Sequence, residues 1–151
     1  MISQTTEYAL RAVVFLANRP DESCTTVVIA EGTQVPTGYL AKVMHSLARA
    51  GIVHSQRGPH GGFHLQADPK DLTALDVTEV MEPVQRFGKC PLGIEHHTPG
   101  LCPLHRVLDD IGATMEEPLG KPPIADLLKG DGGRIPLCKV AADNDIHQIT
   151  D

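Results

Sequence analysis

The sequence predicts a mostly α-helical fold with one small β-hairpin, and the observations that predict it lie in residues 36–65. Pro36 sets the backbone angle for a first helical turn. Apolar side chains then recur at helical spacing, at Tyr39, Leu40, Val43, Met44 and Leu47. Gly51 ends this helix, and residues 52–56 and 63–65 flank a glycine-rich turn as two short strands. The pattern is typical of a winged helix-turn-helix, in which the hairpin forms the wing.

The charge pattern indicates that this region binds nucleic acid. Residues 32–67 contain no Asp or Glu, and Lys42, Arg49 and Arg57 give them a charge of +3. Because the whole chain carries -6, the remaining residues carry -9. A basic face on an acidic protein confines phosphate attraction to one surface. The alternative is a solvated helix and hairpin with few charges.

Two helices are expected before Pro36. Residues 3–18 have a Ser or Thr cap and an apolar series, and Thr25 or Thr26 can cap a second helix. The expected apolar residues of the second helix are Val27, Val28, Ile29 and Ala30. Residues 32–36 then form the turn. A short helix, a turn and a longer helix make a helix-turn-helix, whose second helix enters the major groove.

The outward residues of the recognition helix, residues 37–49, are assigned to DNA. Thr37 lies at its N-terminal end, where hydroxyls and backbone donors reach phosphates or base edges. Two roles for Tyr39 are equally favoured, a contact with DNA and an anchor in the core. Arg57 at the wing tip suits a narrow minor groove. The expected DNA-binding set is Thr37, Gly38, Tyr39, Lys42, His45, Arg57 and His60.

These motifs resemble those of the Rrf-type winged-helix regulators, the family of IscR and NsrR. The matching stretches are Tyr-Leu-x-Lys from residue 39, Leu-x-x-Ala-Gly-Ile-Val from residue 47 and Ser-x-Arg-Gly-x-x-Gly-Gly-Phe-x-Leu from residue 55. Glu-Tyr-Ala-Leu-Arg from residue 7 and, less tightly, a cysteine-bearing loop near residue 90 extend the resemblance over residues 1–130. It implies a dimeric, sequence-specific transcriptional regulator, and a repressor is favoured.

The second half of the chain predicts a long helix beyond a loop. A helix begins at Leu72 or Thr73 and ends before Pro83, and another begins at Pro103 and ends at Pro118. Residues 124–128 form a short helix, and the Gly- and Asp-rich end is expected to be mobile. The expected organisation is a DNA-binding domain, a ligand-binding loop, a dimerisation segment and a tail, at residues 1–83, 84–102, 103–129 and 130–151.

The long helix has an apolar face that the remaining chain is too short to cover. Its members are Leu104, Val107, Leu108, Ile111 and Met115. The resemblance implies that this helix makes a homodimer, and two recognition helices about one DNA turn apart then predict a pseudo-palindromic operator. The alternative use of this face, packing against the first helix of the same chain, is expected to occur as well.

A second constellation lies in the loop and at the start of this helix: Cys90, His96, Cys102 and His105, with five, five and two residues between successive members. Cysteine and histidine bind iron-sulfur clusters, zinc or copper, and the spacing alone does not choose among them. The open readings are an iron-sulfur cluster, a structural zinc, plain reduced thiols and a regulatory disulfide.

The family resemblance favours the cluster. Cluster-bearing members have three cysteines at this six-residue step, whereas this chain has His96 at the middle position. An acid at the place of Glu7 ligates a cluster held by the partner subunit in NsrR-like members, although Glu7 also reads as a helix-start carboxylate. With two cysteines, [2Fe-2S] is favoured over [4Fe-4S], and histidine ligation raises its reduction potential. The expected ligands are Cys90 and Cys102, then His96, His105 or Glu7, with His97 as a further candidate.

Other function classes find little support in the sequence. No run of about 18 apolar residues and no signal-peptide pattern occur, so a cytoplasmic protein is expected. Cys24 and Cys138 have no companions in sequence and read as structural or free thiols. A thiol-dependent enzyme would use Cys90 or Cys102 with a neighbouring histidine. No oxyanion loop or phosphate cradle accompanies them.

Overall fold

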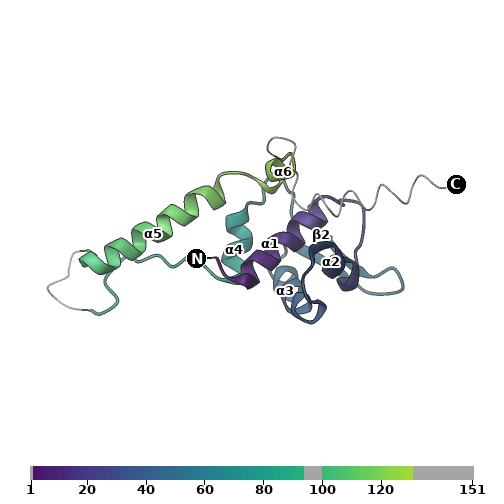
Figure 1. Ribbon diagram of the computed structural model, residues 1–151, viewed down its shortest axis with the longest axis horizontal. Helices are drawn as coiled ribbons and strands as arrows, with labels where there is room; N and C mark the ends of the chain where they lie inside the picture. Colours follow the sequence, from purple (N-terminus) through teal and green to yellow (C-terminus); the bar gives the residue numbers. More distant parts are fainter. Residues whose placement is uncertain (1, 94–99, 131–151) are drawn as a thin grey trace.

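Residues 2–93 and 100–130 are described by the computed structural model, which consists there of helices and one antiparallel hairpin (Figure 1). The predicted fold class is confirmed. The elements are α1 (Gln4–Ala17), α2 (Thr26–Thr33), α3 (Thr37–Arg49), β1 (Val53–Gln56), β2 (Gly62–Leu65), α4 (Ala74–Met81), α5 (Pro103–Gly120) and α6 (Ile124–Leu127). None of these helices is long and apolar enough to cross a membrane. The expected mobile tail, Cys138, His96 and His97 lie outside the described residues.

Hydroxyl side chains fix the starts of three helices. Ser3 and Thr25 accept hydrogen bonds from the third backbone N–H after them, at 3.3 Å in both cases, and cap α1 and α2. Thr73 and Asp76 form a reciprocal capping box at the start of α4. Gly51 ends α3 with a φ of +77°, a conformation that glycine adopts without strain. The helix starts expected at these caps are confirmed.

The hydrophobic core is built around α1, which contacts α2, α3 and α4. One face of α3 enters this core, and the side chains of Leu40, Met44 and Leu47 are completely buried. Ile124 of α6 is also completely buried, and its N–H donates to Leu72 O at 2.7 Å. The core therefore fixes the orientation of the recognition helix relative to α1.

The wing is a two-stranded hairpin with Val53 paired with Leu65 and Ser55 with Phe63. Val53 is buried, and Phe63 packs against the core. The backbone of Cys24 extends the pairing on the other side of β2, since Cys24 and Phe63 exchange two N–H···O bonds of 2.9 and 2.8 Å. The base of the wing is therefore fixed on both sides.

Two details of the helix predictions are wrong. Val27 and Val28 are 54% and 45% exposed, because four consecutive apolar residues span more than one helical turn and only Ile29 and Ala30 face the core. Pro118 does not end the last long helix, which continues to Gly120. The missing proline N–H removes only one hydrogen bond near the end, and Lys121 N still donates to Glu117 O at 3.2 Å.

Helix α5 projects from the helical body (Figure 1) and packs against α4. Its apolar residues remain open to solvent within the single chain: Leu104, Val107, Leu108 and Ile111 are 40–63% exposed. A row of apolar side chains this exposed is typical of a surface that binds another protein. It is the surface that the sequence assigns to dimerisation.

Candidate nucleic-acid interface and metal centre

The start of α3 presents backbone donors to solvent. Pro36 occupies the N-cap position and makes no side-chain hydrogen bond to the first turn. Thr37 and Gly38 are exposed, and no atom lies within 4 Å of the place where a Cβ on Gly38 would stand. Uncapped N–H groups at a helix start attract anions, so this end of α3 is chemically suited to a DNA phosphate.

Tyr39 is partly exposed and is also anchored to α1. Its ring packs edge to face on Tyr8, with centroids 5.6 Å apart, and its hydroxyl lies 2.5 Å from Thr5 Oγ1. The side chain is still 42% exposed. Both readings of Tyr39 therefore have a structural basis, because the residue ties α3 to α1 and also lies at the surface of the recognition helix.

Lys42 and His45 lie exposed farther along α3. The His45 Nδ1 lies 2.7 Å from the Ala41 carbonyl oxygen. Because a carbonyl can only accept, this contact requires the proton on Nδ1, which leaves Nε2 as an acceptor whenever the ring is uncharged. In the major groove, an acceptor suits the amino group of adenine or cytosine.

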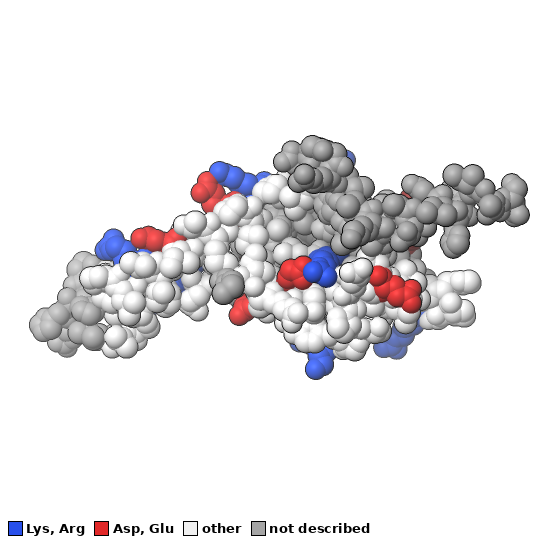
Figure 2. Space-filling model, viewed as in Figure 1, with Lys and Arg blue, Asp and Glu red and all other residues white. Residues whose placement is uncertain are grey.

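The wing tip carries the other predicted DNA residues. Arg57 and His60 are both exposed, and Gly58 next to Arg57 has a φ of +111°. A Cβ on Gly61 would lie 2.6 Å from the Gln56 carbonyl oxygen, so the turn is too tight for a larger residue. In Figure 2, basic side chains project from the lower edge of the molecule beneath α3, whereas the carboxylates visible there lie higher.

Glu7 is occupied within its own helix. Its carboxylate accepts a hydrogen bond from Arg11 Nε at 2.6 Å, and Arg11 Nη1 donates to Thr33 O at 3.1 Å. Arg11 thereby connects α1 with the last residue of α2. The single chain does not bring Glu7 together with the cysteines, so the resemblance-based expectation places it against a partner subunit and remains a prediction.

Cys90, Cys102 and His105 converge at the start of α5. Their ligand atoms all lie within 4.8 Å of one another. His105 Nδ1 is 3.1 Å from the Cys102 sulfur and 3.7 Å from the Cys90 sulfur. Cys102 is the N-cap of α5 and His105 lies one turn later, so the helix itself sets their spacing. Cys90 lies in the loop that precedes α5.

The three side chains fit a metal. Sulfur and nitrogen ligands on one tetrahedral ion, at about 2.3 and 2.0 Å from it, lie about 3.5 Å apart. The distances of 3.1 and 3.7 Å from His105 Nδ1 to the two sulfurs bracket that value. Two thiolates and an imidazole match zinc or a histidine-ligated iron-sulfur cluster, and a fourth ligand is needed in either case.

An ion pair holds the loop before Cys90 against α5. Arg86 donates to both oxygens of Asp109, at 2.8 and 3.1 Å, and also bonds Glu116. The Phe87 N–H donates to Asp109 Oδ1 at 2.8 Å, and the Phe87 ring lies 5.1 Å from the ring of His105. These contacts position both Cys90 and the imidazole.

Gly112 permits the same close approach. A Cβ at this position would come within 2.6 Å of the Gln85 carbonyl oxygen and 2.8 Å of Arg86 Cδ. Because a backbone atom is in the way, a larger residue would push the loop off α5. The roles of Arg86, Asp109 and Gly112 were not predicted from the sequence. The signal available there for the Arg86–Asp109 ion pair is two opposite charges 23 positions apart.

The environment of Cys102 makes its thiol more acidic than an ordinary cysteine. The His105 backbone N–H, and then its side chain, lower the pKa of Cys102 to about 7. Thiolate is the form that binds metals and attacks oxidants. Cys24 differs, because burial raises the pKa of its thiol and it lies in the core. The reading of Cys24 as a structural thiol agrees with this position.

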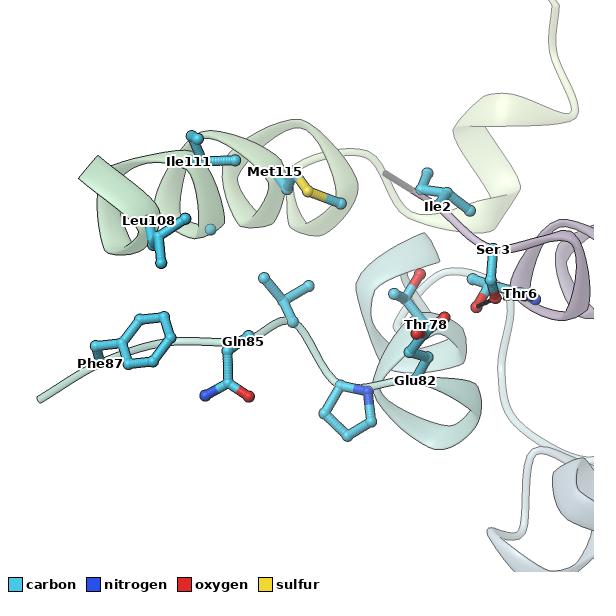
Figure 3. A pocket seen from close by; sticks show the side chains of 13 residues that line it. Ile2, Ser3, Thr6, Thr78, Glu82, Gln85, Phe87, Leu108, Ile111 and Met115 are labelled. Atoms are coloured by element: carbon cyan, nitrogen blue, oxygen red, sulfur yellow. Dashed lines mark hydrogen bonds between the residues drawn. The ribbon is translucent and has the colours of Figure 1, made fainter. Parts of the chain in front are cut away.

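A cavity of about 350 Å³ is lined in part by Phe87, whose ring contacts His105 (Figure 3). It is open to solvent on one side and mainly apolar, and it is lined by the start of α1, the segment after α4 and the inner face of α5, including Thr6, Phe87, Leu108 and Met115. Phe87 therefore has one edge toward this cavity and one ring contact with His105. The start of α1 and the inner face of α5 both line this cavity.

Comparison with known proteins identifies the family. Residues 2–130 match the model of the Rrf2 family, described as an iron-dependent transcriptional regulator. This chain belongs to the Rrf2 family. The family resemblance seen in the sequence is therefore confirmed, and this Rrf2 chain is a DNA-binding transcriptional regulator. Because the family consists of regulators, the thiol-dependent enzyme has no support.

Individual relatives agree with this assignment. The chain is 30% identical over 131 residues to an Aquifex aeolicus protein named as an HTH-type transcriptional regulator, a match covering 85% of this chain and 91% of that protein. It is 32% identical over 128 residues to BadM of Rhodopseudomonas palustris, named likewise, with 85% and 81% covered.

Solved structures of Rrf2 proteins share the fold. CymR of B. subtilis, titled the global cysteine regulator, is 26% identical with a TM-score of 0.67, and the match covers 84% of this chain and 95% of CymR. IscR of T. potens is 22% identical with a TM-score of 0.64, covering 100% and 93% of the two chains. At 22% identity, the similarity to IscR of T. potens shows a shared fold alone.

Proposed function

We propose that this Rrf2 protein is a homodimeric regulator, most simply a repressor, that binds a pseudo-palindromic operator and senses redox state, nitric oxide or iron-sulfur status. The observation that carries the sensing proposal is the convergence of Cys90, Cys102 and His105 at the start of the helix assigned to dimerisation. A change at this point can alter how two DNA-binding units lie relative to each other. It is a switch only if the two states differ in DNA affinity.

The donor types of these residues fit an iron-sulfur cluster, and [2Fe-2S] is favoured over [4Fe-4S] because two cysteines are available in the expected set. A bound cluster supplies electron transfer and a reaction centre for oxidants or nitric oxide. Cys90 and Cys102 would hold it as thiolates, and His105 would contribute a ring nitrogen. Candidates for the fourth ligand are His96 and His97 of the same chain and Glu7 contributed by the partner subunit.

The DNA-binding part of the proposal uses the exposed residues of α3 and the wing. The uncapped start of α3, with Thr37 and Gly38, would bind phosphate, and Lys42 and His45 would face the major groove. Arg57 and His60 at the wing tip, together with Tyr39, complete the proposed set. The absence of acidic residues from positions 32–67 supports this surface over any other.

A zinc-bound or thiol-switching member is the second candidate. The sulfur–nitrogen distances suit a single tetrahedral ion, and the lowered pKa of Cys102, about 7, suits a thiol that oxidises readily. In that case the three residues would bind zinc, or an oxidant would convert the Cys90 and Cys102 thiols to a disulfide, and DNA affinity would follow zinc supply or thiol oxidation.

The test begins by selecting operator sequences from a random duplex library with protein purified without oxygen. The dissociation constant for the selected duplex is then measured before and after nitric oxide or air treatment, for wild type and for Cys90→Ala and Cys102→Ala. We expect treatment to change wild-type affinity at least tenfold and to leave both variants unaffected. Equal affinity in all states of all three proteins would contradict sensing and leave DNA binding intact.

A further inference from the structure

Two histidines face each other across the wing. His54 on β1 is paired with His64 on β2, and their ring centroids lie 5.0 Å apart with an interplanar angle of 43°. Side chains alternate along a strand, so these rings lie on the face opposite Val53 and Leu65, which face the core. We propose that His54 and His64 bind a divalent transition-metal ion such as Zn²⁺, Ni²⁺ or Cu²⁺, at a site separate from Cys90 and Cys102.

The separation of the rings is the one that chelation requires. An imidazole nitrogen binds such an ion at about 2.0 Å, and a ring centroid lies about 1 Å behind the nitrogen, so two imidazoles at a tetrahedral angle have centroids about 5 Å apart. The measured distance between the His54 and His64 centroids is 5.0 Å. The 43° tilt is not a parallel stack, and it lets one nitrogen of each ring turn toward a common point.

The backbone that carries the two rings is already fixed. Val53 is 1% exposed, and β2 is bonded on its outer side to Cys24 by two hydrogen bonds of 2.9 and 2.8 Å. Binding therefore orders only the two imidazoles and not the hairpin. His54 is exposed and His64 is half-buried, which leaves the pair accessible to an ion from solution.

The ligand type restricts the class of ion. Imidazole nitrogen suits zinc, copper and nickel, whereas calcium and magnesium need carboxylate or carbonyl oxygen. No Asp or Glu occurs from residue 32 to residue 67, so the wing itself offers no carboxylate to hard cations. Two protein ligands leave further coordination positions to water, and we expect exchangeable binding rather than a permanent structural ion.

A bound ion would add two positive charges to the hairpin that carries Arg57. Such a charge strengthens attraction to DNA phosphates. In Figure 1 the hairpin and α5 lie at opposite ends of the molecule, so the wing site is remote from the cysteine centre. The effect on DNA rests on the proposed DNA contact of the wing, whereas metal binding by the pair does not.

The test uses the full chain with Cys90→Ala and Cys102→Ala, so that the cysteine centre cannot bind the probe. Ni²⁺ is titrated calorimetrically into this protein and into versions that also carry His54→Gln, His64→Gln or His45→Gln. We expect either wing substitution to weaken binding of one Ni²⁺ equivalent at least tenfold. His45→Gln removes an exposed histidine outside the wing, and in this titration it is expected to leave the Ni²⁺ affinity unchanged. Unchanged Ni²⁺ affinity in both wing variants would overturn the site.

A second measurement does not depend on wing variants. Sub-stoichiometric Cu²⁺ added to the Cys90→Ala, Cys102→Ala protein should broaden the ring-proton resonances of His54 and His64 before those of His45, and equal broadening would overturn the site. Ni²⁺ should also raise DNA affinity in this protein and not with His54→Gln present. Metal binding without any gain in DNA affinity would keep the site and overturn its effect on DNA.

Discussion

Arg86 and Asp109 join the cysteine-bearing loop to α5 through a two-pronged ion pair, with Nε to Oδ1 at 2.8 Å and Nη2 to Oδ2 at 3.1 Å. The pairing geometry matches a planar guanidinium to a planar carboxylate. Asp109 also accepts from the Phe87 N–H, and Phe87 contacts His105. The position of Cys90 relative to Cys102 therefore depends on residues that bind no metal themselves.

This ion pair predicts a specific pH dependence of stability. The Arg86 side chain, and then the Phe87 N–H, lower the pKa of Asp109 from 3.8 to about 2. A carboxyl group with a lowered folded-state pKa stabilises the fold above its ordinary value and loses that contribution as the pH falls toward the folded value. Asp109→Asn should therefore melt at lower temperature than wild type at pH 5. The difference in Tm should shrink between about pH 4 and pH 2, and a constant difference would contradict the assignment.

Dimerisation through α5 predicts that one charge on its apolar face separates the subunits. Ile111 is 53% exposed in the single chain and lies in the row with Leu104 and Leu108. Ile111→Glu would bury a carboxylate at the proposed interface, which is costly without a partner. Sedimentation equilibrium should give a dimer mass for wild type and a monomer mass for Ile111→Glu. Arg106→Glu, an exposed position on the opposite side of α5, is the matched control and should remain dimeric.

The wing contact predicts a change in salt dependence. Arg57→Ala should weaken operator binding and lower the slope of log affinity against log salt by about 0.9, the value for one lost phosphate contact. Arg57→Lys keeps the charge and should retain the slope. Affinities measured over a salt series for the three proteins check this. An unchanged slope in Arg57→Ala would remove the wing from the DNA interface.

Two glycines predict opposite effects on stability. A Cβ on Gly32 would lie 2.0 Å from Phe15 Cε2 in the core, so Gly32→Ala should lower the free energy of unfolding by about 1–3 kcal/mol through overpacking. Gly38 lies in the first turn of α3 with no atom within 4 Å of its Cβ position. Gly38→Ala should therefore stabilise the fold by about 0.5–1 kcal/mol through helix propensity. Urea unfolding of both variants measures the difference, and equal effects would contradict the packing described at Gly32.

The fold was predictable where local chemistry and periodicity agree. Pro36 and Gly51 enclose a helix with a clear apolar face, and the predicted recognition helix has the observed bounds of α3, Thr37–Arg49. The prediction that Val27 and Val28 belong to the apolar face of their helix was wrong, because a run of consecutive apolar residues does not indicate which of them face the core. The prediction that the helix ends at Pro118 was wrong because a proline near a helix end removes only one hydrogen bond.

The candidate site was predictable only in part. Cys102 and His105 are three residues apart on one helix, so their proximity follows from helical geometry. Cys90 comes from a loop, and its place depends on Arg86, Asp109 and Gly112, whose contacts have no periodic signal in the sequence. The pairing of His54 with His64 depends on strand register, which two short strands and a glycine-rich turn do not determine alone.

The most direct test of the sensing proposal is the iron and sulfide content of protein purified without oxygen, with its absorption spectrum from about 300 to 600 nm. We expect a coloured wild-type protein with equal iron and sulfide, and loss of both in Cys90→Ala and Cys102→Ala. His45→Gln should keep the wild-type content. A colourless, iron-free wild type that cannot be reconstituted with iron and sulfide would contradict the cluster, and the three converging residues would then act through zinc or their thiols.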